Sequence, residues 1–374
     1  MKTGVYVHIP FCVSKCGYCD FLSFSDTDEL RTPYIGALIN EISHCEDLDG
    51  LALESVFFGG GTPSLLNEKE IAAILEAITS KTDASSAEIT LEANPASGSF
   101  PKLASIRACG FNRLSIGLQS AQDHLLKALG RTHTLAGFLD IHETAVRSGF
   151  TNINADIMFG LPGQTADDLN QTIDLLTCLK IPHISAYSLT IEEATPFGKM
   201  FGEGDLKLQD EDSERGMYLQ IRENLKNAGY ANYEISNFAH SGRECRHNIL
   251  YWTRQNYLGF GLGAHSLVNN TRRRNTRDIS AYITANGNHS NLVRDIEILD
   301  TASQMAEFIF LGLRMTNGIS LTEFLNQFGV NLSNQFGAQI LKYQNHGLLE
   351  TQGDRLRFTP EGINVSNIIL ADFL

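Results

Sequence analysis

The chain has 374 residues, a formal net charge of −14, and 43% hydrophobic and 19% charged residues. This composition is typical of a folded globular protein with one core domain and one or two smaller ones, and the acidic balance argues against general nucleic-acid binding. No apolar run approaches the ~18 residues of a membrane span, and the N-terminus lacks the apolar core of a signal peptide, so we expect a cytoplasmic protein without stable membrane insertion.

From residue 4 to about residue 190, short β-branched runs alternate with longer helical patterns. This order is typical of a parallel α/β sheet, either open or curved into a partial barrel. Its six units fall short of the eight in a closed (β/α)8 barrel. Strands are predicted at 4–9, 54–58, 87–92, 112–118, 151–159 and 183–190. Helices are predicted at 31–45, 67–79, 99–109, 121–148 (as two helices) and 165–179.

The second half of the chain is less regular. After a predicted helix at 209–229 comes an aromatic, glycine-rich stretch, and from about residue 301 the pattern predicts a small separate domain of winged-helix shape. Its elements are helices near 301–314, 320–328 and 333–345, a hairpin through LLETQGDRLRFT and a last helix at 360–371. Because this tail holds six acidic and four basic residues, we expect it to be structural or to cover a substrate. The predicted domains are 1–190, 191–300 and 301–374.

The carboxyl ends of the predicted strands are rich in polar residues and glycine. In parallel α/β folds the working residues lie at this edge of the sheet. The first strand runs into three cysteines and the second into GGGTPS, while the next three carry Glu92, Gln119 and Asp156. We therefore expect these groups to share one site.

Cys12, Cys16 and Cys19 form a C-x3-C-x2-C array directly after the first strand. Thiolates are soft ligands that select iron–sulfur clusters, zinc or Cu(I). A structural zinc site needs a fourth ligand, which His8 could supply. An iron–sulfur cubane held by three cysteines instead leaves one iron open to a small molecule, which turns an electron carrier into a catalytic site.

The other four cysteines are spread along the chain. Cys45, Cys109 and Cys178 stand alone on apolar helical stretches, so we expect them to be core residues. Cys245 lies two residues before a histidine in the aromatic stretch, which makes it a candidate ligand.

An arginine run, TRRRNTR, holds Arg272, Arg273, Arg274 and Arg277. Its simplest interpretation is a solvated loop. The alternative is a patch that holds phosphate or carboxylate groups.

The cysteine array, with Tyr18 between its last two cysteines, resembles that of the radical S-adenosylmethionine superfamily. The resemblance implies a [4Fe-4S] cluster whose open iron chelates the amino and carboxylate groups of S-adenosylmethionine. It also implies an electron donor for the cluster, since one electron cleaves the sulfonium to methionine and a 5′-deoxyadenosyl radical.

The resemblance further implies a set of S-adenosylmethionine contacts on the strand ends. A glycine-rich turn lets backbone groups approach a ligand closely, so residues 59–61 with Thr62 would meet the methionine moiety. Glu92 and Asp156 are carboxylates suited to an ammonium and to ribose hydroxyls. The implied contacts are Tyr6, Tyr18, Gly59, Gly60, Thr62, Glu92, Gln119, Arg131 and Asp156.

Five further segments, YVHIPFC, FGGGTPS, RLSIGLQS, GLPGQT and GFGLGAHS, resemble the oxygen-independent coproporphyrinogen III oxidase group over nearly the whole chain. That group implies a partial (β/α)6 barrel followed by a smaller C-terminal domain. Two features differ from its oxidases: Phe21 stands where they have a fourth cysteine, and only eleven residues precede Cys12. Both features resemble the HemW branch of heme chaperones, whose signature is C-x3-C-x2-C-x-F.

The segment HNILYW also resembles the H-N-x-x-Y-W motif of that branch, through His247, Asn248, Tyr251 and Trp252. A neutral imidazole is a good axial ligand to heme iron, and aromatic rings can cover a porphyrin face. Cys245 is an alternative thiolate ligand, and the arginine run could pair with heme propionates. Without the resemblance, the motif would be interpreted as an aromatic core patch with a hydrogen-bonded histidine.

Three functions remain open from the sequence. The leading hypothesis is a heme chaperone that binds a [4Fe-4S] cluster, S-adenosylmethionine and heme, and that delivers heme to acceptor hemoproteins. The competing hypothesis is an enzyme that oxidatively decarboxylates two propionates of coproporphyrinogen III. The third is a zinc-stabilised α/β protein without radical chemistry.

Overall fold

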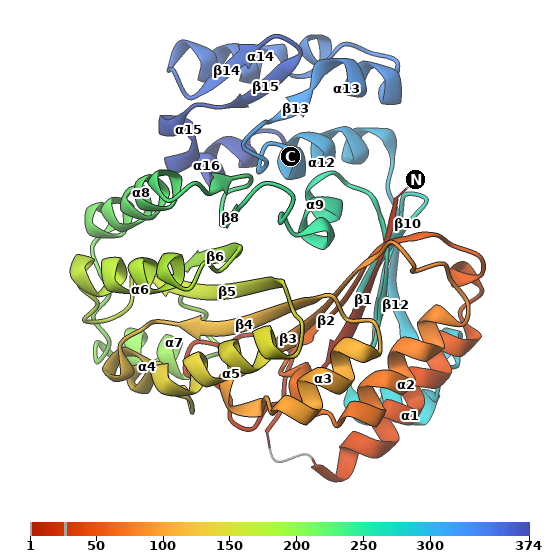
Figure 1. Ribbon diagram of the computed structural model, residues 1–374. Helices are drawn as coiled ribbons and strands as arrows, with labels where there is room; N and C mark the ends of the chain where they lie inside the picture. Colours follow the sequence, from red (N-terminus) through yellow and green to blue (C-terminus); the bar gives the residue numbers. More distant parts are fainter. Residues whose placement is uncertain (1, 26–27) are drawn as a thin grey trace.

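The computed structural model describes residues 2–25 and 28–374. Its centre is a sheet in the order β12-β11-β10-β9-β1-β2-β3-β4-β5-β6-β8-β7, in which β1 to β6 are parallel and adjacent in chain order (Figure 1). Because β1 also pairs with β9 and β6 with β8, the six parallel strands curve without closing on themselves. They are β1 (Thr3–Ile9), β2 (Leu53–Gly60), β3 (Glu88–Ala93), β4 (Arg113–Gln119), β5 (Asn152–Phe159) and β6 (His183–Ser188).

Helices follow these strands and cover the outer side of the curved sheet (Figure 1). This arrangement confirms the predicted partial (β/α)6 barrel. Among the described residues, no helix is long and apolar enough to cross a membrane. The helices are α1 (Asp28–His44), α2 (Glu68–Thr79), α3 (Phe100–Ala108), α4 (Asp123–Ala128), α5 (Leu135–Arg147) and α6 (Ala166–Cys178), with short 3-10 turns η1 (Glu46–Leu48), η2 (Pro63–Leu65) and η3 (Pro95–Ser97).

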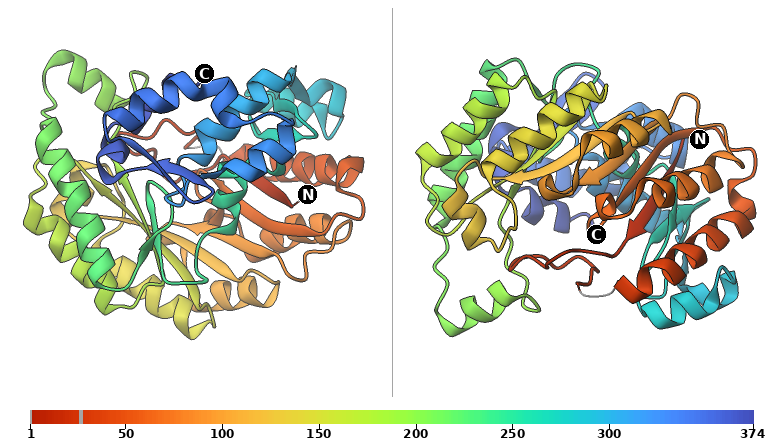
Figure 2. Two further views of the ribbon diagram at one scale, coloured as in Figure 1. Left: turned by 90° about the horizontal axis from the view of Figure 1, so that it is seen from above. Right: turned by 60° about the horizontal axis from the view of Figure 1, so that its bottom comes forward.

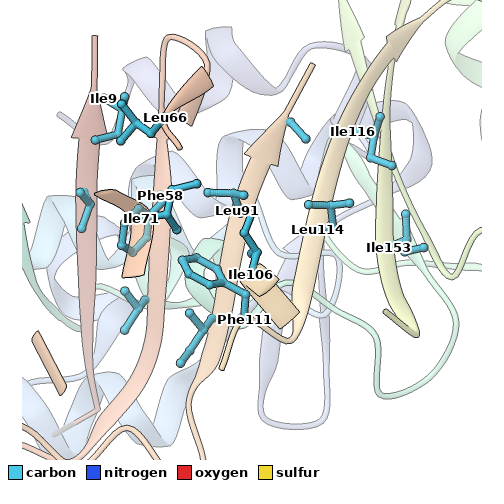
Figure 3. Close-up of a cluster of buried hydrophobic side chains, with 14 of the residues drawn as sticks. Ile9, Phe58, Leu66, Ile71, Leu91, Ile106, Phe111, Leu114, Ile116 and Ile153 are labelled. Carbon is cyan, nitrogen blue, oxygen red and sulfur yellow. The ribbon is translucent and has the colours of Figure 1, made fainter. Parts of the chain in front are cut away.

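Side chains on the barrel strands alternate between two faces. Every second residue is apolar and packs outward against the helices, as Figure 3 shows for Phe58, Leu91 and Leu114 beside Ile71 and Ile106. The intervening residues point into the barrel and are mostly polar. They include Glu92, Arg113, Ser115, Asn154, Asp156 and Ser185.

Residues between 191 and 300 extend the sheet at both edges. One group adds β7 (Ala231–Asn232) and β8 (Asn237–Ala239) beside β6, and the other adds β9 (Asn256–Phe260), β10 (His265–Val268), β11 (Thr271–Asn275) and β12 (Val293–Ile298) beside β1. Their helices are α7 (Pro196–Glu203), α8 (Glu211–Asn227), α9 (Arg246–Trp252), α10 (Ile279–Ala285) and α11 (His289–Leu292). The interpretation of the arginine run as a loop is therefore wrong for residues 272–274, which lie in β11.

The C-terminal part has its own hydrophobic cluster, formed by buried residues from Met305 to Phe373. It combines α12 (Thr301–Gly312), α13 (Leu321–Phe328) and α14 (Leu332–Asn345) with a small sheet of β13 (Ile319–Ser320), β14 (Leu349–Gln352) and β15 (Arg355–Phe358). The predicted last helix is two helices, α15 (Pro360–Asn364) and α16 (Ser366–Ala371), because Val365 leaves helical geometry. Figure 1 shows this part beside α8 and α9, on the side where β1 begins.

Replacing Phe58 with Ala tests the assigned core. Phe58 is fully buried and packs edge-on against Phe111, with ring centroids 5.1 Å apart. We expect Phe58→Ala to lower the free energy of unfolding by ~3–5 kcal/mol, measured by thermal and urea unfolding. Phe201→Ala, at a phenylalanine that is 50% exposed, serves as the control and should change it little. Equal losses in the two variants would contradict this core.

Candidate functional site

A cavity of about 320 Å³ lies at the carboxyl ends of the parallel strands. It brings together most of the residues predicted from the strand ends. Tyr6 is not among them and lines a neighbouring inner cavity, while Gly59 packs against Tyr6 and Glu92. The predicted residues that line the outer cavity are Cys12, Cys16, Tyr18, Cys19, Gly60, Thr62, Glu92, Gln119, Arg131 and Asp156.

The three cysteines lie on a loop whose base is tied to β1. The Phe24 N–H donates to the Pro10 carbonyl at 2.7 Å, and His8 Nε2 lies 2.8 Å from the Leu22 carbonyl oxygen. The loop then crosses the strand ends toward α7 (Figure 2, right), where the Phe197 N–H donates to the Gly17 carbonyl. These contacts fix both ends and the middle of the cysteine loop.

Two of the cysteine sulfurs already have polar neighbours. Thr62 Oγ1 lies 3.7 Å from Cys12 Sγ, and Arg131 Nη1 lies 3.6 Å from Cys16 Sγ. Both groups donate hydrogen bonds to the sulfurs. The loop therefore offers three soft donors of the kind that iron–sulfur clusters take.

Both ring nitrogens of His8 already have hydrogen-bond partners, so metal binding there would require one hydrogen bond to break. The His8 Nδ1 lies 3.1 Å from the Tyr6 hydroxyl and its Nε2 is held by the Leu22 carbonyl. In the described part of the chain, no group of three or more His, Cys, Asp or Glu side chains, the three loop cysteines included, is placed to hold a metal ion. The donor set fits a cluster with one open iron better than a Cys3His zinc site, because His8 would have to give up a hydrogen bond.

Glycines after β2 leave room for close contact. Gly60 has φ +113°, and a Cβ there would lie 2.6 Å from the His8 ring. A Cβ on Gly61 would lie 2.7 Å from the Phe11 carbonyl oxygen. The Gly60 N–H donates to Glu92 Oε2 at 3.3 Å. Only glycine fits at these positions, so the turn passes close to the cysteine loop with its backbone exposed to the cavity.

The end of β4 carries a second unusual turn. Gln119 has φ +69°, a conformation that non-glycine residues rarely adopt, and the pairing of β4 with β5 shifts register there. Gly117 makes room for it, since a Cβ at Gly117 would lie 2.8 Å from Gln119 Nε2. Arg131 Nη2 donates to the Gly117 carbonyl at 3.0 Å. Strain of this kind costs ~1–3 kcal/mol and concentrates at functional sites.

Two carboxyl groups inside the barrel, those of Glu92 and Asp156, lie close enough to repel each other when both are ionised. Asp156 accepts hydrogen bonds from Asn154 Nδ2 at 2.8 Å and Ser115 Oγ at 3.2 Å. Burial raises the pKa of Asp156, and burial together with the Asp156 charge raises the pKa of Glu92 to about 8. A cation that enters beside these groups would restore their ionised form. The site is therefore suited to a positively charged ligand.

His247, the predicted heme ligand, lies toward the opposite end of the barrel on α9. It is 2% exposed, with Nδ1 2.8 Å from Ser55 Oγ and Nε2 3.1 Å from the Tyr251 hydroxyl. Burial lowers its pKa to about 3, so the ring is neutral. It stacks on Phe57 at 5.1 Å between centroids. Both ring nitrogens are engaged, so iron binding would require one hydrogen bond to break.

The other members of the HNILYW motif point in two directions. Asn248 and Tyr251 line the inner cavity of about 180 Å³. Trp252 faces the C-terminal part, where the Arg314 guanidinium lies 5.4 Å from its ring centroid. Cys245 is fully buried, and burial raises the pKa of its thiol to about 12, which disfavours the thiolate that would bind iron.

Acidic side chains neutralise the arginines of β11. Arg272 pairs with Glu297 and Glu307, while Arg273 pairs with Asp47 at 2.7 Å and Arg274 with Asp295. These ion pairs connect β11 to its neighbours. Because all three guanidinium groups are paired with carboxylates, they do not form the anion-binding patch that the sequence left open.

Two of the isolated cysteines are not core residues. Cys109 and Cys178 are exposed, because Cys109 follows the last turn of α3 and Cys178 ends α6, where the helices turn away from the sheet. Cys45 is half-buried.

Several residues inside the barrel were not among the predicted site residues. Each of them lies two residues from another inward-facing residue on the same strand. Because side chains of a strand alternate between its two faces, this spacing could have identified them from the sequence. They are Arg113, Ser115, Asn154, Ser185 and Tyr187.

Known proteins resemble the chain over its whole length. The sequence pattern of the Radical SAM superfamily matches residues 6–176, and that of the HemN C-terminal domain matches residues 299–365. The chain is 36% identical to heme chaperone HemW of Bacillus subtilis (strain 168), covering 100% of this chain and 99% of that protein. It is 35% identical to heme chaperone HemW of Lactococcus lactis, covering 99% of this chain and 97% of that protein.

Among solved structures, coproporphyrinogen III oxidase (HemN) from Escherichia coli, described as a radical SAM enzyme, shares the fold. It aligns with a TM-score of 0.86 at 22% identity, covering 100% of this chain and 90% of that one. At this identity the likeness concerns the fold alone.

The raised pKa of Glu92 predicts a pH-dependent stability. The folded protein holds the Glu92 proton up to about pH 8, whereas the ordinary value is 4.5. The stability that this group contributes is therefore present below pH 4.5 and is lost as the pH rises through about 8. Because glutamine mimics the protonated form, Glu92→Gln should melt ~2–5 °C above the parent protein at pH 9, with a smaller difference near pH 5.

Glu54→Gln is the control, because the pKa of Glu54 is shifted in the opposite direction to that of Glu92. A hydrogen bond from Arg246 lowers the pKa of Glu54, so its contribution is present above its ordinary pKa and is lost in acid. Glu54→Gln should not raise the melting temperature at pH 9. A Glu92→Gln difference that stays constant from pH 5 to pH 9 would contradict the assignment.

Proposed function

The chain belongs to the HemW family within the radical SAM superfamily, and from that premise we propose that it binds heme and passes it to acceptor hemoproteins. One observation carries the proposal: three cysteines, a glycine turn and two half-buried carboxylates line one cavity, in a chain that aligns with 99% of a protein named as a heme chaperone. The proposed site of action is the cytoplasm, where reducing conditions keep the cysteines as thiols.

Three cysteines would hold a [4Fe-4S] cluster in the outer cavity, namely Cys12, Cys16 and Cys19. When bound, the cluster supplies one electron, received from a separate donor, for cleavage of S-adenosylmethionine. In the proposal, Glu92 would accept a hydrogen bond from the ligand's amino group, and Arg131 would add a polar contact near the nucleotide. The remaining proposed contacts are Tyr6, Tyr18, Gly59, Gly60, Thr62, Gln119 and Asp156.

Heme is the proposed cargo, with the HNILYW motif on α9 as its site. His247 would supply the axial nitrogen after release from Ser55 or Tyr251, and the Tyr251 and Trp252 rings would cover the porphyrin. Asn248 completes this set. In the proposed division of the chain, residues 1–190 hold the cluster and the nucleotide, and residues 191–300 hold the heme motif. Residues 301–374 have a structural role or cover the substrate.

Replacing a cluster cysteine tests the iron–sulfur site. After anaerobic reconstitution, the parent protein should hold about four irons and four sulfides per chain, and Cys16→Ser should lose most of both. The control is Cys109→Ser combined with Cys178→Ser, which removes two exposed cysteines outside the cavity and should leave the iron unchanged. A colourless protein that holds zinc and no sulfide would overturn the cluster.

Titration with heme tests the cargo and its ligand. The parent protein should shift the Soret band and retain heme through gel filtration, and His247→Ala should weaken binding at least ~10-fold. His124→Ala, at an exposed histidine of α4, is the control. Melting temperatures are compared in parallel, because His247 is buried. Full binding by His247→Ala would place the iron ligand elsewhere, and absence of binding by the parent protein would refute the chaperone.

The same preparation separates the chaperone from the oxidase. Phe21 replaces the fourth cysteine of the oxidases, so we expect no conversion of coproporphyrinogen III when S-adenosylmethionine and a reductant are added. Turnover to protoporphyrinogen would reverse the ranking of the two functions.

A further inference from the structure

The inner cavity lies inside the barrel, between the carboxylates of the outer cavity and α9. It shares four lining residues with the outer cavity, namely Glu92, Ser115, Asp156 and Tyr187. Most of its other walls are fully buried side chains, among them Asn154 and Cys245. A molecule would therefore reach the inner cavity through the outer one, before a nucleotide occupies the strand ends.

Arg113 lines this cavity without a hydrogen-bond acceptor. It is the first residue of β4, points inward and is 2% exposed. Within residues 2–25 and 28–374, its guanidinium donates no hydrogen bond, and Nε is buried without a partner. Glu88 Oε2 lies 4.0 Å from Nε, which is too long for a hydrogen bond. The other Glu88 oxygen already accepts from the Arg246 N–H at 2.9 Å.

Asn248 adds a second unused donor to the same wall. Its side chain lines the inner cavity and makes no hydrogen bond to any residue that the structure describes. The other polar side chains nearby are already committed. Asn154 bonds Asp156 and Ser115, and Ser185 donates to Asn154. Among the described residues, Arg113 and Asn248 thus supply the unused donors of the inner cavity, and Glu92 keeps one carboxyl oxygen without a partner.

Glu88 offsets the Arg113 charge only at 4.0 Å, and a buried guanidinium that donates no hydrogen bond favours a ligand that brings acceptors. The planar guanidinium matches a carboxylate, which accepts two parallel N–H bonds, and an amide N–H can add a third. The volume of about 180 Å³ corresponds to roughly six waters at ~30 Å³ each, which limits the ligand to a few heavy atoms.

Burial reduces the negative charge that an anion would meet from the two carboxyl groups on the cavity wall. Glu92, whose pKa burial raises to about 8, is mostly neutral at pH 7, and burial also raises the pKa of Asp156. We propose that the inner cavity is a binding site for a small carboxylate, held by Arg113 and Asn248. The HNILYW helix then forms the floor of this site, and both His247 and Asn248 of the proposed heme motif line it.

Thermal shift and NMR with propionate as the probe test this site. Propionate added to the full chain should raise the melting temperature saturably, while sodium chloride at equal ionic strength should not. The NMR resonances of carbon-13-labelled propionate should broaden when the protein is added. Asn248→Leu and Arg113→Gln should each weaken propionate binding at least ~10-fold, and Arg215→Gln, at a surface arginine of α8, should not.

Several outcomes would overturn the proposal. A shift that does not saturate, or that both cavity variants retain, means that water alone fills the inner cavity. Tighter binding of inorganic phosphate than of propionate would refute the carboxylate as ligand class. If Arg113→Gln does not fold, Asn248→Leu decides, since it removes a neutral donor whose loss leaves no buried charge.

Discussion

The two-residue alternation of the six parallel strands is the constraint on which the rest of the protein depends. Leu91 and Glu92 are neighbours in sequence, yet Leu91 packs against the helices and Glu92 lines the cavities. Because the sheet curves, all inward positions converge on one small volume. A slip of one residue in any strand would exchange these faces, so the packing of the apolar core also fixes the register of the polar groups.

Confinement of polar groups in the barrel sets their chemistry. Glu92 and Asp156 are taken out of water by the same curvature that brings them together, and burial raises the pKa of both. Arg113 is buried under the same conditions but keeps its charge, since a guanidinium is not deprotonated in proteins. The barrel therefore presents carboxyl groups that gain charge when a cation arrives, beside a cation that is already charged.

Much of this architecture could be predicted from the sequence, because it depends on the local periodicity of apolar and polar residues. The six strands, their helices and the cysteine loop follow from patterns within a few residues of each other. The place of α9 could not, since no periodicity says which distant segment meets Ser55 and Glu88. The partners of the arginines in β11 were equally hidden: Asp47 and Glu307 lie far away in sequence. The proposed domain boundaries remain predictions.

The segments at the two ends of the barrel come from very different points in the chain. The cysteine loop follows β1, whereas His247 meets Ser55 across 192 positions and Cys245 meets Glu88 across 157. A ribosome releases the N-terminus first, and local contacts form before distant ones. The nascent barrel therefore has its cysteines in place while its lumen is still unsealed at the α9 end. The contacts that close the α9 end therefore become possible only after the six parallel strands and the cysteine loop have been synthesised.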